Sequence, residues 1–82
     1  MSTILRVGKL RVMIYSRDHP PPHVHVVGPG GTAPIQLAGS ARPPLLMENE
    51  GLSKRQLAGA LRAVLEHREI LDEAWSRIHD QQ

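Results

Sequence analysis

The chain of 82 residues has no cysteine and no phenylalanine, and it has only one tryptophan and one tyrosine. The lack of cysteine excludes disulfide bonds and thiolate metal ligands. So few aromatic side chains argue against the stacking platform that single-stranded nucleic acids usually need. No segment approaches the roughly 20 apolar residues of a membrane helix, and the first residues show no signal-peptide pattern. We therefore expect a soluble, cytoplasmic protein that does not bind membranes.

The length is that of one small domain, so residues 1–82 are predicted to fold as a single unit. Such a domain buries only about 60% of the surface of its unfolded chain, which favours stabilisation by a partner or by self-association. Residues 1–47 hold five basic residues and one acid, a net charge of +4, whereas residues 48–82 hold five basic residues and seven acids, a net charge of −2. A basic, β-rich half (1–47) and a helical half (52–79) therefore present different surfaces.

Alternating apolar residues predict an antiparallel β-meander in the first half. Residues 3–7 and 10–16 read as strands joined by Gly8-Lys9, which suits a type II′ hairpin turn and pairs Arg6 with Arg11. Further strands are expected at residues 23–27 and 32–38, on either side of a glycine-rich turn. Residues 39–51 form a connector in which 45–47 make a short strand.

Helical periodicity begins after Ser53, which with Gln56 forms a capping box. The apolar residues at helical spacing are Leu57, Leu61, Val64, Leu65, Leu71, Ala74, Trp75 and Ile78. One straight helix over residues 54–79 would be about 39 Å long, which is long for so small a domain. We therefore predict a break near His67, with His67 and His79 as helix-surface or cap residues and Trp75 in the core.

These elements predict an α+β fold, in which an antiparallel meander of three to four strands is covered on one face by a C-terminal helix or helical pair. The covered face carries Leu5, Val7, Leu10, Val12, Ile14, Val24 and Val26. The open face then carries Ile4 and Met13, together with the polar residues Arg6, Arg11, Tyr15, His23 and His25. Imidazole, guanidinium and phenol groups on one face suit an anionic partner.

The most distinctive segment is Asp18-His19-Pro20-Pro21-Pro22-His23-Val24-His25-Val26. It holds three of the five histidines within seven positions, and histidine is the commonest metal ligand and titrates near neutral pH. The prolines stiffen the chain that leads into the strand. Because His23 and His25 are two residues apart on a strand, their side chains project from the same side, about 6.6 Å apart at Cα.

Three interpretations of this cluster stay open at the level of sequence. His23 and His25, completed by His19 or Asp18, suit zinc or another divalent metal. His23 and His25 also suit a metal-independent ribonuclease, one imidazole acting as base and the other as acid. In the third interpretation the histidines are structural and hydrogen-bond the strand ends and the proline loop.

The same segment resembles the Asp-His-x-Pro-Pro-His-Phe-His-Val signature of small bacterial proteins called domain of unknown function 4160. Residues 50–55 are similar to that family's sequence at the start of its helix, and residues 71–75 are similar to its closing Leu-x-x-x-Trp. The family has no established activity, and its members often lie beside a gene for another small protein. The resemblance therefore implies a regulatory or toxin–antitoxin-like module.

The function that we favour from sequence is a binding or regulatory module, one half of a two-gene pair. Its open face would bind through Arg6, Arg11 and Tyr15 together with His23 and His25, with Asp18 and His19 beside them. The expected partners are a small protein from the neighbouring gene, a nucleic acid, or a second copy of the chain. The alternatives are the ribonuclease that uses His23 and His25 and the metal-binding protein that uses His19, His23 and His25.

Overall fold

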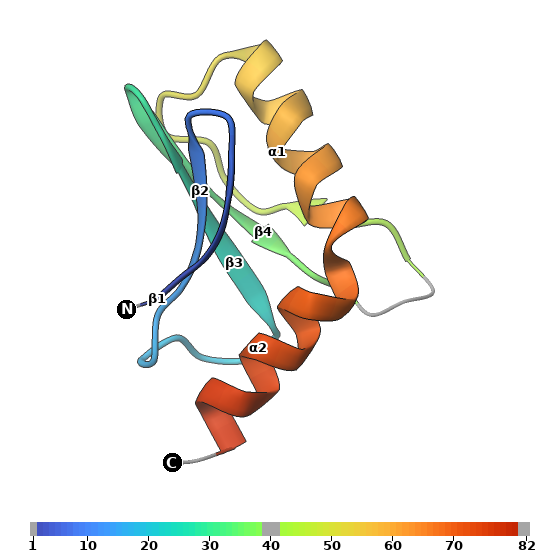
Figure 1. The fold of residues 1–82 in the computed structure, drawn as a ribbon. Coiled ribbons are helices and arrows are strands. Elements are labelled where there is room, and N and C mark those ends of the chain that lie inside the picture. The colour runs from blue at the N-terminus through green and yellow to red at the C-terminus, as the bar shows by residue number, and fades with distance from the viewer. Residues whose placement is uncertain (1, 39–41, 81–82) are drawn as a thin grey trace.

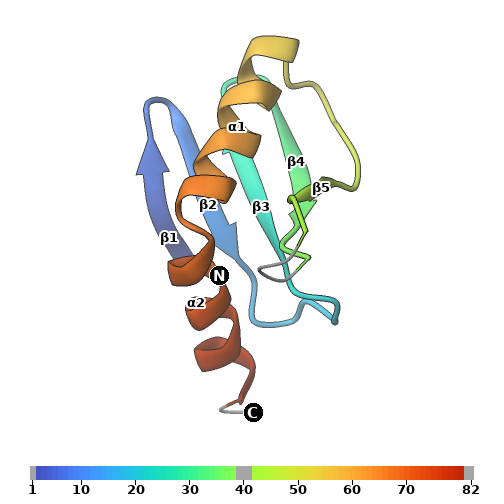
Figure 2. The same ribbon diagram turned by 90° about the vertical axis from the view of Figure 1, so that its right-hand side faces the viewer.

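The computed structural model describes residues 2–38 and 42–80. Five strands form one antiparallel sheet in chain order, namely β1 (Ser2–Val7), β2 (Leu10–Ile14), β3 (His23–Gly28), β4 (Gly31–Gln36) and β5 (Leu45–Leu46). Two helices, α1 (Lys54–Glu66) and α2 (Arg68–Asp80), follow one another along one side of the sheet (Figures 1 and 2). The predicted α+β class is confirmed, and the short strand expected at residues 45–47 joins the meander as β5, so the sheet has five strands rather than three to four. Residues 39–41, the start of the predicted connector, lie outside the described residues.

The β1–β2 hairpin has the register that its turn predicts over three pairs, Val7 with Leu10, Arg6 with Arg11, and Leu5 with Val12. Beyond Leu5 the register shifts, and Thr3 rather than Ile4 pairs with Met13. An extra residue of this kind is a β-bulge, which ends simple alternation. The expectation that Ile4 shares a face with Met13 is therefore wrong.

The core lies between the sheet and the two helices. Alternate residues of β2, β3 and β4 are buried on this side, and Val24 and Val26 are fully buried as predicted. The helices contribute Ala60, Val64, Leu71, Ala74 and Trp75 to the same cluster. On β1, however, Val7 is 37% exposed and Leu5 only half-buried, so the helices cover the sheet incompletely at this edge. Met13, which pairs with His25 of β3, is also buried, at 5% exposure.

The helical half is divided into two helices at His67, where the sequence predicts a break. At its start, the Ser53 N–H donates to Gln56 Oε1 at 2.8 Å, and the Gln56 N–H donates to Ser53 Oγ at 3.1 Å, which completes the capping box. At the end of α1, His67 is the C-cap and its N–H donates to Ala63 O at 3.1 Å. Helix α2 begins at the next residue. Among the described residues, no helix is long and apolar enough to span a membrane.

Two glycines provide a matched test of this packing. A Cβ at Gly31 would lie 2.7 Å from Leu52 N and meet the backbone of Glu50 and Gly51, whereas a Cβ at Gly59 in α1 meets only Leu10 Cδ1 at 3.8 Å. We expect Gly31→Ala to lower the free energy of unfolding by about 2 kcal/mol or more and Gly59→Ala to raise it by about 0.5–1 kcal/mol. Urea unfolding followed by circular dichroism measures both. A Gly31→Ala chain as stable as the wild type would contradict this account of the close approach.

Candidate functional site

The proline loop is the segment of residues 15–22 between β2 and β3. It closes on itself at its start, where the Asp18 N–H donates to Tyr15 O at 3.1 Å and the Tyr15 N–H donates to Asp18 Oδ2 at 3.3 Å. The Pro20–Pro21 peptide bond is cis. At the end of the loop, Pro22 O accepts a hydrogen bond from Leu37 N at 3.0 Å. The loop is thus tied at both ends, and it brings the Asp18 carboxylate to the first residues of β3.

Asp18, His23 and His25 form a compact three-residue cluster. His25 Nε2 lies 3.1 Å and His23 Nε2 3.5 Å from the same atom, Asp18 Oδ2. The side chains of Asp18, His23 and His25 are 16%, 12% and 22% exposed, respectively. One ligand atom from each residue lies within 4.8 Å of the others. As predicted from alternation, the two histidines project from one side of β3, but they are half-buried rather than openly displayed.

The hydrogen bond of His23 to the loop fixes which of its nitrogens is protonated. His23 Nδ1 lies 2.9 Å from Pro21 O, and because a carbonyl oxygen only accepts, Nδ1 carries the hydrogen. In the neutral ring, Nε2 then presents a lone pair to the Asp18 carboxylate, which presents lone pairs of its own. Two such acceptors facing each other at 3.5 Å repel unless a cation, either a proton or a metal ion, lies between them.

The spacing of the cluster suits a metal ion. Two ligand atoms that bind one zinc ion at about 2.0–2.1 Å are separated by about 2.8–3.0 Å at adjacent octahedral positions and by about 3.3–3.4 Å in tetrahedral geometry. The observed separations of 3.1 and 3.5 Å from Asp18 Oδ2 lie close to these values. The bond from His23 Nδ1–H to a backbone carbonyl is the outer-shell contact that metal-binding histidines usually make. Three protein ligands also leave a coordination position open.

Aromatic rings form a continuous chain from the sheet to α2. Tyr15 lies 4.5 Å from His25, His25 lies 5.1 Å from His23, and His23 lies 5.3 Å from Trp75, all measured between ring centroids. Trp75 stacks on His79 at 3.7 Å. Trp75 is 6% exposed, which confirms the prediction that it is a core residue. Its ring also contacts His23 and so borders the cluster on one side.

His79 connects the end of α2 to the proline loop. Its Nδ1 lies 2.9 Å from Trp75 O and its Nε2 lies 3.1 Å from Asp18 O, a residue 61 positions earlier. Interpreted from sequence as a helix-surface or cap residue, His79 thus has a tertiary role that the sequence analysis missed. One signal was available, because residues four apart on a helix are neighbours and His79 follows Trp75 by four. His67, by contrast, is the cap residue that was predicted.

The remaining predicted site residues lie outside the cluster. His19 is exposed and lines a shallow hollow with Ser16, Arg17 and Asp18, so Asp18 rather than His19 joins the two histidines. Arg6 and Arg11 are exposed and directly opposite each other. Arg11 pairs with Val27, and His25 pairs with Met13, so Arg11 and His25 are diagonal neighbours on one face of the sheet.

The contacts of His79 predict its contribution to stability. We expect His79→Ala to lower the free energy of unfolding by about 1–2 kcal/mol, because it removes a stacked ring and the hydrogen bond to the loop. The control is His67→Ala, which changes the same residue type at the helix break, and we expect it to cost less than half as much. Denaturant unfolding monitored by the fluorescence of the single tryptophan gives both values. Equal losses would show that the contact of His79 with the loop contributes nothing.

Residues 10–76 match the family model of the Domain of unknown function (DUF4160). No curated protein and no solved structure shows significant similarity to the chain. The chain therefore belongs to the DUF4160 family, as its proline and histidine segment indicated. The match covers the proline loop, the histidine cluster and α2 as far as Ser76, one residue beyond Trp75. The family description gives no activity, so function has to be argued from the site itself.

Proposed function

We propose that this DUF4160 domain binds one divalent transition-metal ion through Asp18, His23 and His25. The observation that carries the proposal is the convergence of His25 Nε2 and His23 Nε2 on Asp18 Oδ2, at 3.1 and 3.5 Å. Two imidazoles and one carboxylate form a donor set that suits zinc, and it also occurs at iron sites. We favour zinc because it is redox-inactive and binds histidine and carboxylate ligands in tetrahedral geometry.

The way the protein holds these side chains supports a metal site. The proline loop is fixed by its own hydrogen bonds and by the bond from Leu37 to Pro22, so little order has to be gained on binding. Pro21 O orients the His23 ring, and Trp75 covers one side of it. Partial burial strengthens the attraction between ligands and ion. An open fourth position on the metal would be available to water or to a ligand.

The geometry also bears on the interpretations that the sequence left open. Asp18 replaces His19 in the proposed ligand set because only Asp18 lies within reach of both histidines. For a metal-independent ribonuclease, the two imidazoles would have to act on different atoms of one substrate. In the structure both Nε2 atoms point instead to a single carboxylate oxygen, which favours a ligand set over an acid–base pair.

Zinc titration tests the proposal directly. We expect the untagged protein to bind one zinc ion per chain by calorimetry, and Asp18→Asn or His25→Ala to weaken binding by about 100-fold or more because each removes a ligand. His19→Ala and His67→Ala are the matched controls and should change affinity by less than about threefold. Visible absorption of the cobalt-loaded protein reports the coordination number independently.

Two outcomes would contradict the metal site. One is the absence of stoichiometric binding by a folded wild-type protein, and the other is a loss on His19→Ala as large as that on His25→Ala. Cleavage of RNA by the metal-free protein, abolished by His23→Ala, would restore the ribonuclease interpretation.

A second candidate function, binding of an anionic partner, rests on the Arg6–Arg11 pair. Like charges directly opposite each other on neighbouring strands destabilise a sheet, and both of these side chains are exposed. An anionic group placed between them would relieve the repulsion. This supports the binding module that the sequence favours, with a nucleic acid or an acidic protein as partner. The small protein of the neighbouring gene and the toxin–antitoxin-like pairing stay predictions.

Charge reversal tests the arginine pair. We expect Arg6→Glu/Arg11→Glu to weaken binding to the co-expressed neighbouring-gene product or to a short RNA by about tenfold or more, with a smaller salt dependence than that of the wild type. Arg55→Glu/Arg62→Glu makes the same change in net charge on the exposed residues of α1 and should have little effect. Equal losses in both double variants would indicate a net-charge effect and would exclude a site on this face.

A further inference from the structure

Arg68 is the one buried charged side chain among the residues that the structure describes. It is 9% exposed, and its Nε and Nη2 atoms have no hydrogen-bond partner. A guanidinium group stays charged at all ordinary pH values, so it cannot escape burial by losing a proton. A buried charge without a partner is strongly destabilising, and exceptions of this kind in a native fold call for an explanation.

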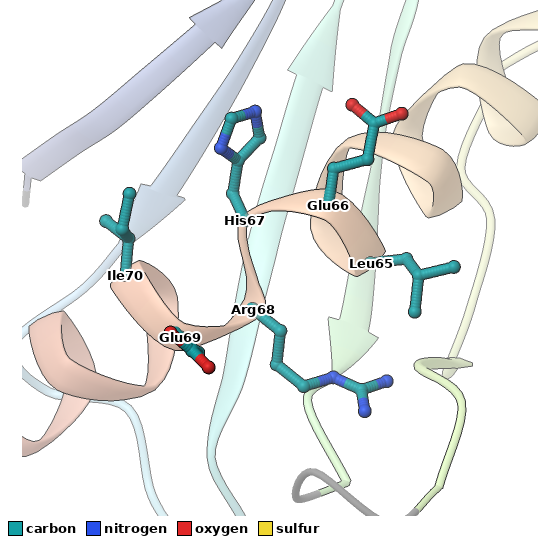
Figure 3. A pocket seen from close by; sticks show the side chains of 6 residues that line it. All are labelled: Leu65, Glu66, His67, Arg68, Glu69 and Ile70. Carbon is teal, nitrogen blue, oxygen red and sulfur yellow. The ribbon is translucent and has the colours of Figure 1, made fainter.

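Arg68 lies at the break between the helices, as the first residue of α2. Around it is a hollow of about 360 Å³ at the surface, within the size range of small-ligand sites. Figure 3 shows the Arg68 side chain extending away from the helical backbone on the same side as Leu65. The hollow, which we call the break notch, is lined by Leu65, Glu66, His67, Arg68, Glu69 and Ile70.

We propose that the break notch binds a carboxylate, held by Arg68 through two parallel hydrogen bonds. Nε and Nη2, the two unpartnered atoms, lie on the same edge of the planar guanidinium group. This edge matches the two oxygens of a carboxylate, which accept one hydrogen bond each. The amide groups at the start of α2 add a partial positive charge at the same place.

The lining of the notch selects a carboxylate over a phosphate. Glu66 and Glu69 also line the notch, and their two negative charges disfavour a doubly charged anion or a nucleic-acid backbone. Leu65 and Ile70 are each 56% exposed. Leu65 projects to the same side of the backbone as Arg68, whereas Ile70 projects to the other (Figure 3), so Leu65 offers apolar contact to the carbon chain that carries a carboxylate, as in a dicarboxylic acid or an acidic side chain.

The burial of the unpartnered atoms sets the mode of binding. Nε and Nη2 each expose less than 1 Å², so a carboxylate reaches them only when a covering group moves aside.

The notch is also separate from the Asp18–His23–His25 cluster. Arg68 and Trp75, which contacts His23, are seven positions apart on α2, about 10 Å along the helix axis. Failure of either proposal therefore leaves the other standing.

The Nε–Hε resonance of Arg68 gives a direct test in the full-length ¹⁵N-labelled protein, with assignment by Arg68→Lys. We expect sodium glutarate to move this resonance downfield to a saturating value, and sodium chloride at equal ionic strength to leave it in place. The internal control is Arg77, which is exposed and paired with Glu73 on the same helix and should not respond. If the Arg68 resonance instead moves with protein concentration in the absence of added carboxylate, the proposal is supported, and the carboxylate comes from a side chain of a second copy of the chain.

Two results would overturn the carboxylate site. If phosphate saturates the Arg68 resonance at lower concentration than glutarate, the ligand class is wrong. If no anion gives a saturating shift, or if glutarate and chloride act alike on all arginines, there is no site.

Thermal unfolding of Arg68 variants separates binding from a structural role. Arg68→Met replaces the charge with an apolar chain of similar length, so we expect its Tm in carboxylate-free buffer to exceed that of the wild type. The rise in Tm that glutarate causes in the wild type should vanish in this variant. Arg68→Lys keeps the positive charge but loses the pair of parallel N–H donors, so it should bind glutarate at least fivefold more weakly. This variant provides the comparison if Arg68→Met does not fold. A steep fall in Tm in both variants, with no response of the wild type to glutarate, would make Arg68 a structural residue.

Discussion

Asp18 is the residue on which the other features of the site depend. Its carboxylate accepts from Tyr15 N and faces both His23 and His25, and its carbonyl lies within hydrogen-bond distance of His79. One residue thus joins the proline loop, the start of β3 and the end of α2. The same contacts that order the loop bring two imidazole nitrogens to one carboxylate oxygen. Stability of the loop and the proposed capacity to hold a cation therefore have a common physical cause.

The helix break explains how the end of α2 reaches this loop. In Figure 1, α1 and α2 follow the sheet in sequence, and the last turns of α2 lie beside the proline loop. A straight continuation of α1 would not follow the sheet in this way, so Trp75 and His79 owe their positions to the change of direction at His67. The break has a second consequence, because a helix start exposes unpaired amide groups. Arg68 lies at that start, which makes the break notch a product of the same bend.

Local sequence signals predict most of the fold and only part of the site. The Gly8-Lys9 turn gave the hairpin register, the Ser53 and Gln56 pair gave the helix start, and alternation placed His23 and His25 on one side. Contacts between distant segments leave no such signal. The approach of Asp18 to the histidines depends on the path of the proline loop, and the contact of His79 spans 61 residues. The bulge at Ile4 and the missing partner of Arg68 likewise arise only when strands and helices are assembled.

Three places in this domain carry electrostatic interactions that its own described side chains do not complete. Two lone pairs face each other in the Asp18–His23–His25 cluster, two guanidinium groups lie opposite each other at Arg6 and Arg11, and the Nε and Nη2 atoms of Arg68 are buried without a hydrogen-bond partner. Each is relieved by an ion of a defined sign, a cation in the first case and an anion in the other two. Ligands that bind only the folded state raise its stability by mass action, and a domain of this size has little stability in reserve. The binding functions proposed for these three places would therefore make folding and ligand binding mutually dependent in this chain.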